Sequence, residues 1–203
     1  QFIGIDPSSQ MLEKASARNQ DIRWLQGRAE DTGLSNNSVD GVIASLTVHH
    51  WSNLEKGFQE LYRVLKNNSR LVLFTSTSEQ MRGYWLNHYF PGMLKDSIVQ
   101  MPAPGDLETA FASAEFKVKL KEKYFIHPEL EDKFLYCGKQ NPELYFNEQI
   151  RNGISSFSDL ANQDEVSKGL TQLRKDIENG RIGEIIESFE NDMGDYLFII
   201  LEK

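Results

Sequence analysis

The chain has 203 residues, 39% hydrophobic and 11% aromatic, which is long enough for one α/β domain with a real core. Its 30 acidic and 22 basic residues give a net charge of -8, and no cluster of Lys and Arg offsets it. This balance argues against a nucleic-acid partner, because such partners are held by basic surfaces. The single cysteine, Cys137, excludes an internal disulfide and a multi-cysteine metal site.

The apolar runs of the sequence are short. No apolar run approaches the length that spans a bilayer, so we expect no membrane partner. Together with the lone cysteine, this predicts a cytoplasmic protein. The pattern leaves the oligomeric state open.

The first part of the chain predicts a β-α-β unit. The apolar run Phe2–Ile5 is short and continuous, as in a buried parallel strand, and Asp6 stands at its carboxyl end. A Pro-Ser-Ser sequence then begins a helix, since serine caps helices well and proline suits their first turn. Ile22 and Trp24 indicate the second strand, and Gly27 its exit turn.

The following segment predicts a second unit of the same kind. Val39–Leu46 is an apolar strand, and apolar residues at helical spacing indicate a helix over 53–66. A turn at Asn67, Asn68 and Ser69 separates that helix from a strand at Leu71–Phe74. This order of elements predicts a doubly wound, mostly parallel α/β sheet.

The last two strands differ in their patterns. Phe116, Val118 and Leu120 alternate with lysines, which predicts a strand with one buried face at a sheet edge. The strand at 196–201 is apolar throughout, as an interior strand would be, so we expect it to lie inside its predecessor.

The segments between the strands are predicted to be helical. A helix is expected over 79–94, broken near Pro91, and a short helix precedes the strand at 116–121. Two apolar stripes with Gly180 between them predict an inserted helical cap over 128–194. The predicted core is then 1–127 plus 195–203.

Three blocks of sequence carry a resemblance to a known family. They read FIGIDPSSQMLEKA, QGRAEDTGLSNNSVDGVIASLTVHHW and LEKGFQELYRVLKNNSRLVLF, and they cover about the first two fifths of the chain. In order and spacing they resemble the class I S-adenosylmethionine-dependent methyltransferases that act on small molecules. The resemblance implies a Rossmann-like sheet with an antiparallel last strand, S-adenosylmethionine as cofactor, and in-line methyl transfer to a small organic acceptor.

Asp6 is the first cofactor-binding residue that the resemblance implies. A carboxylate at the end of this strand could accept both ribose hydroxyls. The alternative is a cap at the start of the next helix, beside Pro7. Nicotinamide-dependent enzymes place an acidic residue similarly, so Asp6 does not select the cofactor.

The next strand is followed by Arg28, Ala29 and Glu30, where the family contacts adenine. We expect Glu30 to bind the adenine amino group and Ala29 to contact adenine through its backbone. Arg28 would stack or form an ion pair with Glu30. A solvated charged turn is the alternative. Met11 is included as an adenine neighbour, although a core role is common for methionine.

Residues after the third strand are expected to line the methionine end of the cofactor and the acceptor. Ser45 and Leu46 would contribute backbone atoms. His50 could take a proton from the acceptor, because the pKa of histidine lies near working pH. His49 and Trp51 would contact the substrate, or the histidines would only shape the pocket.

Trp85 and Tyr89 complete the predicted substrate site, since they follow a strand's carboxyl end. An aromatic stripe is also typical of a core. No spaced set of ligands predicts a metal site, because His88 and His127 are remote in sequence from the His49–His50 pair.

The family's first strand and glycine-rich turn have no counterpart in this sequence, which contains no GxGxG. We expect the natural polypeptide to supply them before Phe2, and this chain alone to bind the cofactor poorly. Two alternatives to a methyltransferase stay open at this point. One is a catalytically silent relative with a binding or regulatory role, and the other is a nicotinamide-dependent enzyme.

Overall fold

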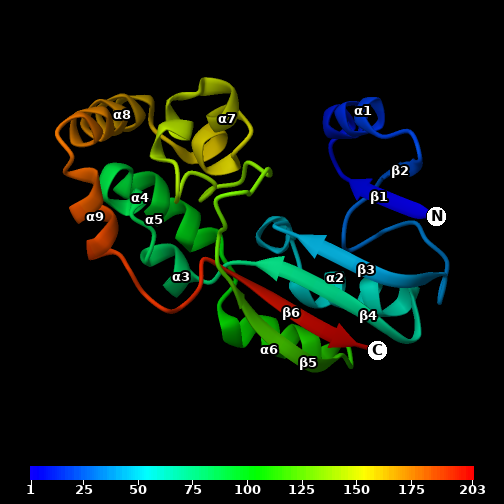
Figure 1. The fold of residues 1–203 in the computed structure, drawn as a ribbon. Coiled ribbons are helices and arrows are strands. Elements are labelled where there is room, and N and C mark those ends of the chain that lie inside the picture. The colour runs from blue at the N-terminus through cyan, green and yellow to red at the C-terminus, as the bar shows by residue number, and fades with distance from the viewer. The chain divides into compact units, whose positions relative to one another are not determined.

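The computed structural model describes residues 1–203 and divides into two compact units (Figure 1). Unit 1 contains Gln1–Phe74, Pro104–Lys121 and Ile199–Lys203. Unit 2 contains Thr75–Ala103 and Glu122–Phe198. The predicted helical cap therefore lies within unit 2, which also contains the helical segment before it, Thr75–Ala103. The domain division made from the sequence stays a prediction.

Unit 1 begins with the predicted β-α-β unit. Strands β1 (Phe2–Asp6) and β2 (Ile22–Gln26) form a parallel pair, joined by helix α1 (Ser9–Arg18). Asp6 lies opposite Gln26, so both strands end at the same level.

A second, four-stranded sheet has the order β3-β4-β6-β5. Its strands are β3 (Val39–Ser45), β4 (Leu65–Thr75), β5 (Lys117–Tyr124) and β6 (Tyr196–Glu202). β3 and β4 are parallel, and β6 lies inside β5, which confirms the order predicted from the apolar and lysine-rich patterns.

Strand β6 runs antiparallel to its neighbours (Figure 1). Near the start of β4, the amide of Asn68 donates to the carbonyl of Lys203, which follows β6, over 3.2 Å. Just before β6, the amide of Asp195 donates to the carbonyl of Tyr124, the last residue of β5, over 2.8 Å. Pairing the end of one strand with the start of the other requires opposite directions, so the fold class is confirmed as mostly parallel α/β with an antiparallel last strand.

The predicted turn at residues 67–69 is an irregularity inside β4. Val39 pairs with Leu65, but Gly41 pairs with Arg70, so the intervening residues of β4 are looped out of register. Asn68 takes a left-handed backbone with φ of 61°, which asparagine tolerates better than most residues. The strand therefore begins earlier than the sequence predicted.

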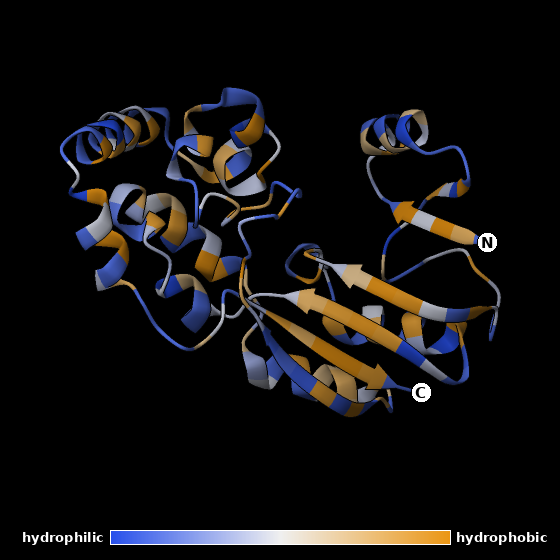
Figure 2. Cartoon of the chain, in the orientation of Figure 1, coloured by the Kyte–Doolittle hydropathy of each residue, from blue (hydrophilic) through white to orange (hydrophobic).

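Helices α2 (Leu54–Val64) and α6 (Pro104–Ser113) pack together and form the core of unit 1. The rings of Phe58 and Phe111 meet edge to face, 4.7 Å apart. In Figure 2, strands β3, β4 and β6 carry mainly apolar residues. The side chains that fill this core are Phe58, Leu61, Val64, Leu65, Leu71, Leu73, Phe111 and Leu201.

Strand β5 departs from its prediction. Phe116, just before the strand, is buried, but Val118 and Leu120 are 44% and 45% exposed. The alternation correctly indicated a strand and an edge. It was wrong about a buried face, because alternation cannot show whether another element covers the apolar side.

Unit 2 is helical. The single helix predicted over 79–94 is instead α3 (Ser78–Arg82), α4 (Leu86–Tyr89) and the start of α5 (Pro91–Gln100). Gly169 lets α8 (Gln163–Glu178) approach the end of α4, because a Cβ there would lie 2.4 Å from the ring of Phe90 and 2.5 Å from the carbonyl oxygen of Tyr89. No helix of the structure is both long and apolar enough to cross a bilayer. The helices of this unit are α3 (Ser78–Arg82), α4 (Leu86–Tyr89), α5 (Pro91–Gln100), η2 (Pro142–Phe146), α7 (Glu148–Asn152), η3 (Ser156–Leu160), α8 (Gln163–Glu178) and α9 (Ile182–Ser188).

Candidate cofactor and acceptor site

Two hydrogen bonds join the carboxyl ends of β1 and β2. The amide of Gly27 donates to the carbonyl of Asp6 over 3.3 Å, and the side chain of Gln26 donates to the carbonyl of Pro7 over 3.0 Å. Sequence reasoning missed Gln26, because nothing in the pattern marks a strand-end amide as a cross-strand donor.

The carboxylate of Asp6 has one oxygen engaged and one free. Oδ1 accepts from the amide of Ser8 over 2.7 Å, whereas Oδ2 has no partner in the protein. Ser8 itself caps α1, since its hydroxyl accepts from the amide of Met11 over 3.3 Å. Ser8, and not Asp6, is therefore the N-cap of α1. Oδ2 of Asp6 remains available to accept a hydrogen bond from a ligand. Met11 is 52% exposed, so it is not a core residue.

The turn after β2 is rigid. Arg28 and Asp31 exchange two backbone hydrogen bonds of 3.1 Å, which fixes the backbone around Ala29. The side chain of Arg28 is exposed, and those of Ala29 and Glu30 are half-buried.

Glu30 connects this turn to helix α2. Its Oε1 accepts from the amide of Ser52 over 2.6 Å, from the Ser52 hydroxyl over 2.9 Å and from the amide of Asn53 over 3.1 Å. Burial alone would raise the pKa of Glu30, but hydrogen bonds from its own amide, from Asn53 and from Ser52 outweigh burial and hold the pKa below its ordinary value. Sequence reasoning missed Ser52 and Asn53, which lie far from Glu30 along the chain.

The end of β3 leads into a strained corner. Leu46 has a left-handed backbone with φ of 49°, which is uncommon for a residue other than glycine, and its amide donates to the carbonyl of Phe74 over 2.8 Å. Strain of this kind often occurs at binding sites. Ser45, just before it, is exposed.

The two histidines after this corner, in η1 (Val48–His50), differ in environment. His50 is exposed, whereas Nδ1 of His49 is buried and has no hydrogen-bond partner. Burial, and to a lesser extent His50, lowers the pKa of His49 to about 4, so its imidazole is neutral at physiological pH. A buried polar atom without a partner is costly, which makes Nδ1 a candidate for a ligand contact.

Trp51 packs against helix α2. Its ring centroid lies 4.9 Å from that of Phe58, and a Cβ at Gly57 would lie 2.6 Å from the Trp51 ring. Because Ser52 and Asn53 follow directly and bind Glu30, the structure brings the turn after β2 together with the loop that carries the histidines.

Trp85 and Tyr89 lie in the interior of unit 2. They are 0% and 4% exposed, respectively. The amide of Trp85 donates to the hydroxyl of Tyr136 over 3.2 Å, and the hydroxyl of Tyr89 donates to Oδ2 of Asp176 over 3.2 Å. The structure thus shows both residues in the packing of unit 2, and their contact with a substrate stays a prediction. No group of His, Cys, Asp and Glu is arranged to hold a metal ion.

Comparisons with known proteins show the family to which the chain belongs. Residues 1–73 match a family model described as a methyltransferase domain. A demethylmenaquinone methyltransferase from Desulfitobacterium hafniense is 31% identical over 137 residues, which cover 55% of this chain and 54% of that protein. A ubiquinone/menaquinone biosynthesis C-methyltransferase from Campylobacter jejuni is 25% identical over 133 residues, covering 60% and 57%.

A solved structure matches over more of the chain. It is a protein from Anabaena variabilis, described as a methyltransferase from an antibiotic biosynthesis pathway, with 35% identity and a TM-score of 0.84. The match covers 99% of this chain and 81% of that one. The chain therefore belongs to the class I S-adenosylmethionine-dependent methyltransferase family. It spans little more than half the length of the two quinone methyltransferases.

Proposed function

We propose that this protein transfers the methyl group of S-adenosylmethionine to a small organic acceptor. The observation that carries the proposal is a pair of carboxylates, with Asp6 at the carboxyl end of β1 and Glu30 in the turn that follows the adjacent parallel strand β2. Ligands of open α/β sheets bind in the crevice at this edge. Family membership supports the same reading of the pair.

Each carboxylate keeps an oxygen that no other side chain occupies. Oδ2 of Asp6 would accept from the ribose hydroxyls, while Oδ1 holds the turn through Ser8. Oε1 of Glu30 is taken by Ser52 and Asn53, which leaves Oε2 for the adenine amino group. The protein would thus place adenosine with preformed acceptors.

The remaining predicted contacts surround this pair. Pro7 and Met11 would flank the ribose and adenine from the start of α1, and Arg28 and Ala29 would contact adenine from the rigid turn. The backbone at Ser45 and Leu46 would border the methionine portion.

When bound, the cofactor supplies an electrophilic methyl carbon: the acceptor's electron pair forms the new bond, and the S–CH₃ pair leaves on sulfur as S-adenosylhomocysteine. The leaving sulfide needs no proton, so the protein can act by alignment and exclusion of water. His49, neutral and with a free Nδ1, would accept a hydrogen bond from the acceptor's O–H or N–H group. The exposed His50 could then receive the acceptor's proton.

The first acceptors to test are hydroquinones, because two relatives are named for methylation in quinone biosynthesis. The full-length protein would be incubated with S-adenosylmethionine and a naphthohydroquinone, and S-adenosylhomocysteine would be measured over time. Acceptor-dependent release supports methyl transfer. Cofactor binding without release for any member of an acceptor panel would favour the catalytically silent alternative.

A further inference from the structure

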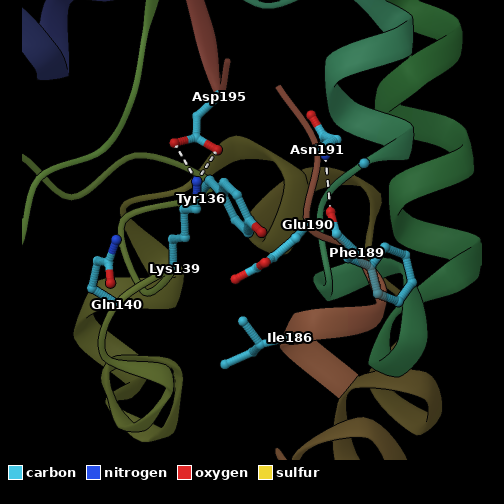
Figure 3. Close-up of a pocket in the computed structure, with 9 residues that line it drawn as sticks. Tyr136, Lys139, Gln140, Ile186, Phe189, Glu190, Asn191 and Asp195 are labelled. Carbon is cyan, nitrogen blue, oxygen red and sulfur yellow. Dashed lines mark hydrogen bonds and ion pairs between the residues drawn. The ribbon is translucent and has the colours of Figure 1, made fainter. Parts of the chain in front are cut away.

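A cavity of about 290 Å³ lies within unit 2, and none of its lining residues is among those assigned to methyl transfer. Its walls come from the loop after β5, from the end of α9 and from the residue before β6 (Figure 3). The volume is at the lower end of the range for ligand sites in proteins. Gly83 borders it and allows a close approach of Asn191, because a Cβ there would lie 2.6 Å from the Asn191 amide nitrogen.

One charge pair in the cavity wall is already neutralised. Nζ of Lys139 donates to both carboxylate oxygens of Asp195, over 2.7 Å and 2.8 Å. Asp195 is buried, and its Oδ2 also accepts from the amide of Ile126 over 2.8 Å. Lys139 is therefore committed to Asp195, and the pair adds no net charge to the cavity.

Glu190 supplies the remaining charge. Figure 3 shows its carboxylate extending into the space between Lys139 and Ile186, and no cation of the protein pairs with it. Glu190 is itself exposed, and with the Lys139–Asp195 pair neutral it is the one charged residue of the cavity wall without an ion-pair partner. The side chain of Ile186, from α9, points into the same space and provides an apolar surface (Figure 3).

We propose that this cavity binds a small monocationic amine, with its ammonium group on Glu190 and its apolar part against Ile186. An anionic ligand would meet an unpaired carboxylate and no free cation, so electrostatics select against it. The proposal goes beyond methyl transfer, because it concerns binding within unit 2 and is tested without turnover.

The test uses the full-length protein and three probes of similar size: phenethylamine, 2-phenylethanol and 3-phenylpropionate. Dissociation constants would be measured by calorimetry at low and high salt. The amine is expected to bind most tightly and to lose affinity in salt. Glu190→Gln should weaken amine binding about fivefold while leaving the alcohol unaffected.

Glu187→Gln is the matched control, since Glu187 lies in α9, three residues before Glu190 in the sequence, and does not line the cavity. Methyl NMR of isoleucine-labelled protein locates the probe through the Ile186 signal, which Ile186→Val assigns. A selective shift of Ile186 by the amine supports the site. Equal binding of the three probes, no binding of the amine at millimolar concentration, or equal effects of the two glutamine variants would overturn it.

Discussion

Asp195 in unit 2 and His49 in unit 1 differ in how their polar side-chain atoms are satisfied. In unit 2, Asp195 is saturated by Lys139 and Ile126. In unit 1, Nδ1 of His49 is buried without a hydrogen-bond partner, and Oδ2 of the partly exposed Asp6 accepts no hydrogen bond from the protein. Folded proteins satisfy nearly all buried polar atoms, so saturated groups are expected to stabilise the fold and unsaturated ones to meet a ligand. The comparison predicts large stability effects in unit 2 and mainly binding effects in unit 1.

The largest effect is expected from Asp195→Ala. This change leaves Lys139 without its partner and the amide of Ile126 without an acceptor, which should cost about 3–5 kcal/mol of unfolding free energy. Denaturant unfolding would measure the loss. The control Asp192→Ala removes an exposed carboxylate and should change stability little; equal stability of the two variants would contradict the structural role of Asp195.

The second effect concerns pH. Because the folded pKa of His49, about 4, lies below its ordinary value of 6.5, the unfolded state takes up the proton first as pH falls. Stability is fully present above pH 6.5 and should decrease by roughly 1–3 kcal/mol as pH falls towards 4. Unfolding experiments on His49→Gln should show a weaker dependence, whereas His127→Gln should keep that of the wild type.

A smaller loss is expected from Glu165→Ala. The Glu165 carboxylate accepts from the amides of Gly92 and Met93, over 2.6 Å and 3.0 Å, at the start of α5. Removing this cap should cost about 0.5–2 kcal/mol. Thermal unfolding of this variant would be compared with that of Glu187→Ala, which removes an exposed glutamate, and identical midpoints would show that the contact is not stabilising.

The smallest effect is expected at the edge strand. Leu120→Ala in β5 should stay within about 0.5 kcal/mol of the wild type, because Leu120 is 45% exposed. Leu201→Ala, in the neighbouring β6, should cost about 2–5 kcal/mol, because Leu201 is fully buried. Similar losses for both variants would show that β5 is covered in solution.

Local pattern was sufficient to predict the strand end at Asp6 and the turn that leads to Glu30. The apolar run closed by Asp6 predicted the end of β1, and Gly27 predicted the exit turn of β2, and the structure confirms both ends. The bonds from Ser52 and Asn53 to Glu30 were not predictable, since they join segments more than twenty residues apart. Such contacts depend on tertiary structure, which spacing along the chain does not encode.

Residues with two plausible environments were also beyond the pattern. Trp85 and Tyr89 fit a substrate wall or, more commonly for an aromatic stripe, a core, and only the structure shows them buried with hydrogen-bond partners. His49 and His50 are adjacent and chemically identical, yet only His49 has a buried, unpartnered nitrogen. Burial decides these cases, and it is a property of the folded chain.

The most direct test of the central claim is the affinity of the full-length protein for S-adenosylmethionine. Asp6→Asn should weaken binding by about 10- to 100-fold, as expected for a hydrogen bond to a charged group, with little change in stability. Asp21→Asn, at the opposite end of β2, is the control and should bind as the wild type does. Unchanged affinity in Asp6→Asn, measured by calorimetry, would contradict the assignment of the strand-end carboxylates to the cofactor.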